Sequence, residues 1–116
     1  MKIALCFSGQ ARSFEKGYEY YKRNLLDHYD VDVYIHTWYF DDYMKLNKLY
    51  NPVKMVTEEP VWHDTTRYTN TPNAQKYPPI FTYRMFYSMY ECSKLIKGEY
   101  DWVIRSRTDY ALNVKI

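Results

Sequence analysis

Glycine is scarce in this chain, and its scarcity excludes two well-defined phosphate-binding motifs. Only three glycines occur among 116 residues, at Gly9, Gly17 and Gly98. A P-loop needs two glycines followed by Lys and then Ser or Thr, and the dinucleotide fingerprint needs three closely spaced glycines. Neither pattern is present, so any nucleotide would have to be bound in another way.

Cysteine is also scarce, which argues against a structural disulfide or a zinc site. Cys6 and Cys92 are the two cysteines, and neither belongs to a Cys-x-x-Cys pair. Both fall in apolar patterns, where a free cysteine behaves as a small hydrophobic residue. No histidine or cysteine lies at zinc-ligand spacing. We therefore expect both thiols to be reduced and buried, as suits a cytoplasmic protein.

Long apolar runs and an excess of one charge are missing too. No stretch approaches the roughly 20 apolar residues of a membrane span, and the N-terminal run "MKIALCFSG" is too short for a signal peptide. The net charge of +2 is too small for a general nucleic-acid binder. We expect no transmembrane segment and no nucleic-acid partner, and an anion would have to bind at a local cluster of charge.

The hydrophobic content of 47% is enough for a core, and its pattern predicts an α/β domain. Runs rich in apolar residues predict strands at 2–8, 31–38, 53–59 and 100–107. Apolar residues at helical spacing predict helices within 9–30, 41–52 and 80–99. This alternation is typical of a Rossmann-like, mainly parallel sheet of about four strands flanked by helices. We expect a single domain over residues 1–116.

Details of two helices and one loop follow from composition. Ser13 can cap the first helix, and Gly17 should weaken it by about 1 kcal/mol relative to alanine. Gly98 suits the end of the last helix. Residues 58–78 are rich in Pro, Thr and Asn, and a loop of that length is either mobile or functional. The apolar stripe expected to face the core in the last helix is Phe81, Met85, Met89, Cys92 and Ile96.

Polar residues gather where three of the predicted strands end. In parallel sheets, ligands bind outside the carboxyl ends of the strands, so we expect these residues to converge on one edge of the sheet. They are Ser8, Gly9, Gln10 and Arg12 after the first strand, His36, Thr37 and Trp38 in the second, and Arg105, Arg107 and Asp109 in the fourth.

The first two groups each allow two interpretations. Gly9 permits a tight turn before a helix N-terminus, which suits a phosphate group, but an ordinary strand-to-helix turn would also use it. His36 could donate to a ribose or phosphate and Trp38 could stack on a base. The alternative is a buried histidine with its hydrogen bonds satisfied, beside an interfacial tryptophan.

The third group carries the most charge. Arg105, Arg107 and Asp109 share one strand parity, and two guanidinium groups suit a diphosphate, which arginine can bind bidentately. Asp109 could ligate a divalent cation on the same phosphates. The alternative is an Arg–Asp pair with a structural role.

Three motifs in this order resemble glycosyltransferases of bacterial and viral surface-glycan loci with a GT-A-type fold, in their N-terminal, nucleotide-sugar-binding part. The motifs are "ALCFSGQARSF", "DVDVYIHTW" and "YDWVIRSRTDYAL". The resemblance implies that residues 8–12 and 36–38 border the nucleotide. It also puts Arg107-Thr108-Asp109 at the Asp-x-Asp position, which holds a divalent cation (Mn²⁺ or Mg²⁺) on the diphosphate. Arg107 replaces the first aspartate there, and the sequence stops before the usual acceptor-binding half.

The expected activity is therefore sugar transfer from a nucleotide-sugar donor to a glycan acceptor, by a whole enzyme or its donor-binding half. Arg105, Arg107 and a cation at Asp109 would stabilise the departing diphosphate. An oligomer or a missing second half would complete the acceptor site. The alternative is a non-catalytic nucleotide-binding or interaction domain. Another nucleotide-using α/β enzyme is disfavoured by the absent glycine motifs.

Overall fold

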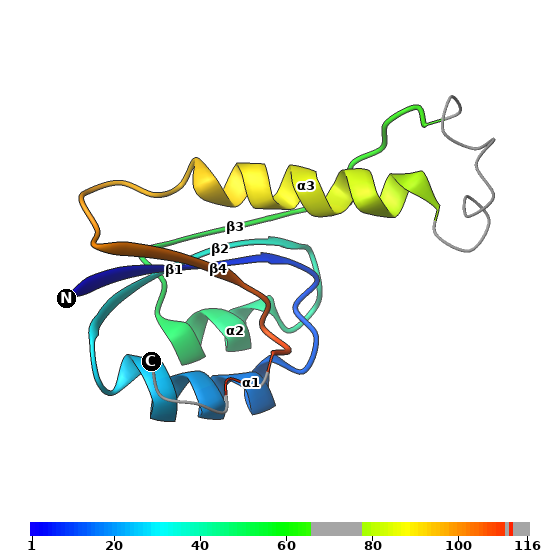
Figure 1. Cartoon of the computed structure of the whole chain (residues 1–116). Helices are drawn as coiled ribbons and strands as arrows, with labels where there is room; N and C mark the ends of the chain where they lie inside the picture. Colours follow the sequence, from blue (N-terminus) through cyan, green and yellow to red (C-terminus); the bar gives the residue numbers. More distant parts are fainter. Residues whose placement is uncertain (66–77, 111, 113–116) are drawn as a thin grey trace.

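The computed structural model describes residues 1–65, 78–110 and 112, and within them strands and helices alternate (Figure 1). The elements in chain order are β1 (Lys2–Gly9), α1 (Phe14–Tyr21), the π-helical turn η1 (Lys22–Leu26), β2 (Asp30–Trp38), α2 (Tyr43–Tyr50), β3 (Lys54–Glu58), α3 (Pro79–Ser93) and β4 (Trp102–Ser106). The predicted α/β class is confirmed.

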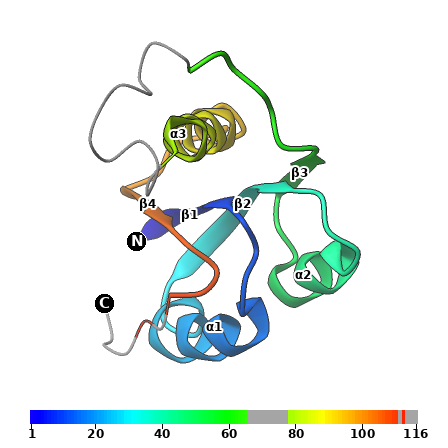
Figure 2. The same ribbon diagram turned by 90° about the vertical axis from the view of Figure 1, so that its right-hand side faces the viewer.

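The strands of the described part form one four-stranded, entirely parallel sheet in the order β3-β2-β1-β4. Helices α1 and α2 cover one face and α3 covers the other (Figures 1 and 2). β2 and β3 extend the sheet on one side of β1, whereas α3 carries the chain back to β4 on the other side. The strand order therefore reverses between β1 and β4, and such a reversal is where α/β sheets bind ligands.

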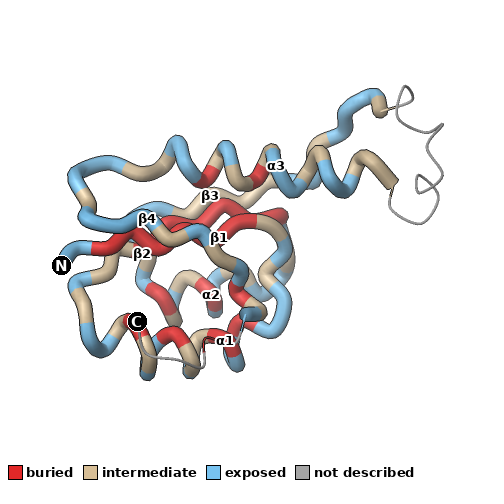
Figure 3. The backbone as a smooth tube through the Cα atoms, viewed as in Figure 1, coloured by how far each residue is buried: buried red, intermediate tan, exposed pale blue. Residues whose placement is uncertain are grey.

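The core explains why β1 is apolar along nearly its whole length. Ile3, Leu5 and Phe7 belong to the larger cluster, between the sheet and α1 and α2. Ala4 and Cys6 belong to a smaller cluster against α3, together with Cys92. A strand covered on both faces needs apolar residues at every position, and Figure 3 shows β1 and β2 as a continuous buried layer. Both cysteines are free and buried, as expected.

Helix α3 packs on the sheet through small residues, so the predicted apolar stripe holds for Cys92 and Ile96 but not for its first members. Ser88 and Cys92 are its buried residues, whereas Phe81 and Met85 are 61% and 44% exposed. The helix ends at Ser93, so Ile96 follows it and Gly98 does not form its C-terminus. Small side chains let the helix approach β1 and β2 closely, and the bulky residues of its first turns point elsewhere.

Two smaller expectations concern the N-cap of α1 and the predicted loop 58–78. Ser13 occupies the N-cap of α1, but its φ is 48° and its side chain makes no capping hydrogen bond. Of the predicted loop 58–78, residues 66–77 lie outside the described part of the chain. The part of the chain that the structure describes contains no helix long and apolar enough to cross a membrane.

Candidate anion-binding site

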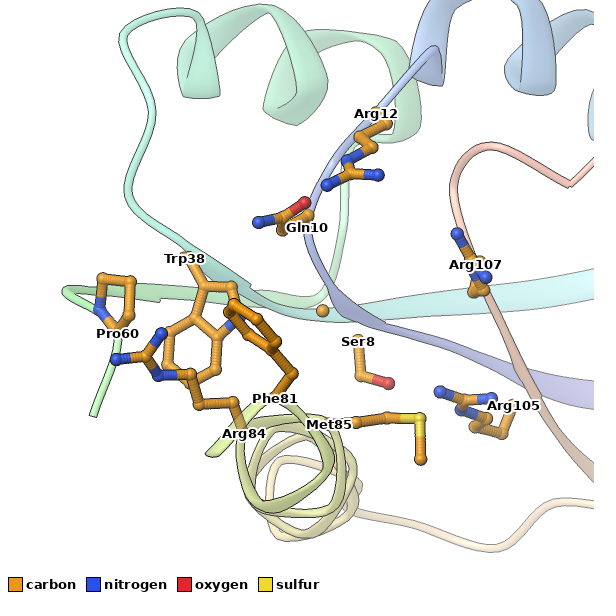
Figure 4. A pocket seen from close by; sticks show the side chains of 11 residues that line it. Ser8, Gln10, Arg12, Trp38, Pro60, Phe81, Arg84, Met85, Arg105 and Arg107 are labelled. Carbon is orange, nitrogen blue, oxygen red and sulfur yellow. The ribbon is translucent and has the colours of Figure 1, made fainter. Parts of the chain in front are cut away.

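A cavity of about 450 Å³ opens at the carboxyl ends of β1, β2 and β4, beside the first turns of α3 (Figure 4). This is the position at which the strand order reverses. Its lining residues are Ser8, Gly9, Gln10, Arg12, Trp38, Pro60, Phe81, Arg84, Met85, Arg105 and Arg107. The strand-end expectation thus holds for the residues of the first group, for Trp38, and for both arginines of the last group.

Positive charge dominates this cavity. It is supplied by Arg12 after β1, Arg84 in α3, Arg105 in β4 and Arg107 just after β4. None of the described lining residues is acidic. Because the whole sequence has a net charge of only +2, the cavity concentrates charge that the rest of the chain balances. Guanidinium groups bind phosphate oxygens strongly and often bidentately, so the cavity is suited to a multiply charged anion.

Gly9 forms the turn at the floor of the cavity. Its φ of +90° strains any residue with a side chain. Its N–H donates to Ser88 Oγ at 2.7 Å, and its carbonyl accepts from Thr37 Oγ1 at 2.7 Å. Thr37 is 2% exposed and does not line the cavity. The sequence-based expectation that Thr37 borders a ligand is corrected, because its hydroxyl is used to hold Gly9.

His36, like Thr37, contacts other protein groups and does not face the cavity. It is 1% exposed, with Nδ1 2.7 Å from Ser88 Oγ and Nε2 2.8 Å from Glu58 Oε1. Both ring nitrogens are therefore engaged, and His36 does not line the cavity. The expected donation from His36 to a ribose or phosphate is replaced by the alternative, a buried histidine with its hydrogen bonds satisfied.

Ser88 links this network to the turn, and its removal should weaken the fold. In a Ser88→Ala variant, the Gly9 N–H and the facing His36 nitrogen lose a buried partner, so we expect the free energy of unfolding to fall by about 1–2 kcal/mol. Ser93→Ala is the control, because Ser93 is exposed on the same helix and its hydroxyl donates to the Tyr90 carbonyl; its effect should stay within about 0.5 kcal/mol. Urea denaturation compares the two, and equal stabilities would contradict the network.

Trp38 forms one wall of the cavity. Tyr87 stacks on it, with ring centroids 5.9 Å apart and an interplanar angle of 17°. A hydrogen bond between Tyr87 and the Glu58 carboxylate raises the pKa of Tyr87 to about 12. Trp38 is only 8% exposed, so it offers a bounding surface and little free face for stacking on a base.

The segment after β4 is held by α1 and not by continued strand pairing. β4 ends at Ser106, so Arg107 and Asp109 lie in a turn and the predicted common strand parity does not apply to them. The Tyr21 hydroxyl hydrogen-bonds Ser106 Oγ and donates to the Arg107 carbonyl at 3.1 Å. Helix α1 thereby determines where Arg107 leaves the sheet.

Gly17 makes this attachment possible. A Cβ at position 17 would lie 2.0 Å from the carbonyl oxygen of Thr108, so the helix and the turn touch through a bare backbone. Helix propensity alone presents Gly17 as a weak point in the helix. The overlooked indication was its position between Phe14 and Tyr21, on the face that is buried.

Asp109 does not line the cavity, but its carboxylate is bonded to an arginine that does. Asp109 Oδ2 accepts from Arg107 Nη2 at 2.8 Å. Among residues 1–65, 78–110 and 112, no three His, Cys, Asp or Glu side chains are grouped so that they could hold a metal ion. The residues present do not fit the divalent cation that the Asp-x-Asp resemblance implies. The Arg–Asp pair, the alternative interpretation, is what the structure contains.

Arg84, Phe81 and Met85 line the cavity although sequence analysis did not place them there. Their spacing puts all three on one side of α3, and Figure 4 shows them facing the strand ends. Arg84 is steadied by a hydrogen bond from Nε to the Val61 carbonyl at 2.8 Å. Apolar spacing alone suggested a core stripe, and the arginine within it was the indication of a solvent-facing site.

Comparison of the chain with protein-family models, with curated proteins and with solved structures gives no match.

Proposed function

We propose that this chain is a glycosyltransferase, or the donor-binding half of one, that transfers a sugar from a nucleotide-sugar to a glycan acceptor. One observation carries the proposal: four arginines and no described carboxylate line a cavity at the carboxyl ends of β1, β2 and β4. Such a cavity favours a ligand with concentrated negative charge, and the diphosphate of a nucleotide-sugar has that charge.

The lining residues divide into two kinds that match the two parts of such a donor. Arg105 and Arg107 would hold the diphosphate and stabilise the charge that develops on it as the glycosidic bond to the sugar breaks. Phe81 and Met85 are exposed and form an apolar side on which a base or a sugar ring could pack, with Trp38 bounding it. The acceptor site would be completed by an oligomer or by a second half. A cytoplasmic location, expected from the reduced cysteines, belongs to the same proposal.

A non-catalytic nucleotide-binding domain is the second candidate. The described residues that line the cavity include no histidine, aspartate or glutamate, and therefore none of them is an evident general base. This observation favours binding without transfer.

The binding part of the proposal is tested by removing Arg107. We expect Arg107→Ala to weaken binding of a nucleoside diphosphate by about 1.5–3 kcal/mol, because a charge-assisted hydrogen bond is lost. Arg67, in the predicted loop, lies outside the described residues, so Arg23→Ala is the matched control. Arg23 is exposed on η1 and lies against the ring of Tyr20. Isothermal titration calorimetry with UDP, GDP and ADP measures the effect, and equal affinities of the two variants would refute the assignment.

The catalytic part needs a transfer assay with the same protein. A panel of nucleotide-sugars is incubated with a pool of glycan acceptors, and release of nucleoside diphosphate is followed. We expect the chain alone to bind donor and to turn over slowly or not at all, since positioning an acceptor can contribute roughly 7–11 kcal/mol to catalysis. Transfer at any rate above that of the Arg107→Ala variant supports the enzyme and contradicts the second candidate. Binding without transfer is expected both of a donor-binding half and of the second candidate, and absence of any nucleotide binding refutes both.

A further inference from the structure

Ser8 has a buried hydroxyl that no described residue hydrogen-bonds. The residue is 6% exposed, and its Oγ has no hydrogen-bond partner among the described residues. Buried hydroxyls almost always make hydrogen bonds, so an orphan needs an explanation. In Figure 4 this oxygen lies at the floor of the cavity and points to the side from which Arg105 enters. A ligand oxygen placed there would satisfy Ser8 and contact the arginine.

The charges around Ser8 indicate whether a ligand in this cavity would carry a divalent cation. A divalent cation on a diphosphate supplies positive charge and needs oxygen ligands from the protein. Here the lining residues already supply four guanidinium groups and, in the described part, no carboxylate. The nearby carboxylates already have partners: Asp109 is paired with the cavity-lining Arg107, and Glu58 with His36. A cation brought into this cavity would be repelled by the arginines and would find no anionic protein ligand among these residues.

We infer, on the basis of the proposed function, that the cavity binds the diphosphate of its donor directly and without a divalent cation. The Ser8 hydroxyl donates to a diphosphate oxygen at the floor, and Arg105 binds beside it. Arg12 and Arg107 close over the remaining oxygens. Metal bound to the diphosphate in solution cancels charge that the arginines recognise, so free diphosphate binds more tightly than its metal complex.

The test measures binding of inorganic pyrophosphate, UDP, GDP and ADP by calorimetry, once in EDTA and once with excess Mg²⁺ or Mn²⁺. We expect Kd in EDTA to lie below Kd with metal. An equal or higher affinity on adding metal overturns the inference while leaving the proposed function intact. If pyrophosphate binds in EDTA and no nucleoside diphosphate binds more tightly, the anion site stands and the donor function fails. If nothing binds under either condition, both fail.

Ser8→Ala tests the innermost contact, with Ser93→Ala as its control. Loss of one hydrogen bond to the ligand should raise Kd for pyrophosphate about two- to tenfold. A hydroxyl with only a structural role would lower the melting temperature when removed. Removing an unpartnered buried hydroxyl should leave the melting temperature unchanged or raise it. An unchanged Kd, or a lowered melting temperature, would overturn the role of Ser8.

Arg105→Gln should raise Kd for pyrophosphate roughly ten- to hundredfold, while Arg23→Gln leaves it unchanged.

Discussion

A Phe7→Ala variant is expected to lose about 3–5 kcal/mol in free energy of unfolding. Phe7 is 1% exposed in the central strand β1. Its ring meets Tyr21 edge-on at 5.1 Å and Tyr50 at 4.9 Å, measured between centroids. Truncation removes buried area and leaves a cavity between the sheet and two helices. Chemical denaturation should show a lower midpoint with a similar slope.

The control for this variant is Phe86→Ala, on the outer side of α3. Phe86 is 58% exposed, so its truncation should change stability by about 0.5 kcal/mol or less. If Phe7→Ala does not fold, Phe7→Leu keeps most of the apolar volume and should lose a smaller part of the same energy. Similar losses for Phe7→Ala and Phe86→Ala would show that β1 presents its other side to α1 and α2.

A Gly17→Val variant is expected to lose about 3 kcal/mol, toward the upper end of the overpacking range. Helix propensity predicts the opposite sign, since glycine is the poorest helix former apart from proline. The clash decides the outcome, because the added Cβ would lie 2.0 Å from the Thr108 carbonyl oxygen, which belongs to rigid backbone. The turn that carries Arg107 must then move away from α1, and affinity for pyrophosphate should fall as well.

Lys16→Val is the matched control, because Lys16 is the exposed neighbour of Gly17 in the same helix. Its cost should be the helix-propensity difference, below about 1 kcal/mol. Denaturation and calorimetry on both variants separate the two effects. A Gly17→Val protein more stable than the wild type would mean that the turn does not pack on α1.

Much of the fold was predictable because the apolar runs of β1 and β2 reflect where these strands lie. Both faces of the sheet are covered there by helices. The rule that strand ends meet then brought Gly9, Trp38 and Arg105 together without any knowledge of side-chain contacts. Periodicity could not predict the partner of His36, because Ser88 follows 52 residues later and its distance in space depends on how α3 lies. The same limit applies to Arg84, which periodicity assigned to a helix but not to a face.

Gly17 shows a different limit. Intrinsic propensity describes what a residue does to its own helix, and by that measure Gly17 is unfavourable. A glycine is needed at position 17 because the backbone of Thr108, which is far away in sequence, packs against it. Asp109 is a related case, since strand parity was extended past Ser106 where the sheet has already ended.

The pairing of β1 with β4 has a consequence for how the protein folds. Ile3 pairs with Trp102, so the central strand gains its second neighbour from the far end of the described chain. The β1-α1-β2 unit closes through local contacts, whereas this long-range pairing carries a larger entropy cost and forms late. Because Ser8 lies on β1 and Arg105 on β4, the cavity comes into being in that last step. An anion that bridges the two strands would bind only the completed sheet, and it would therefore stabilise the pairing of β1 with β4 against opening.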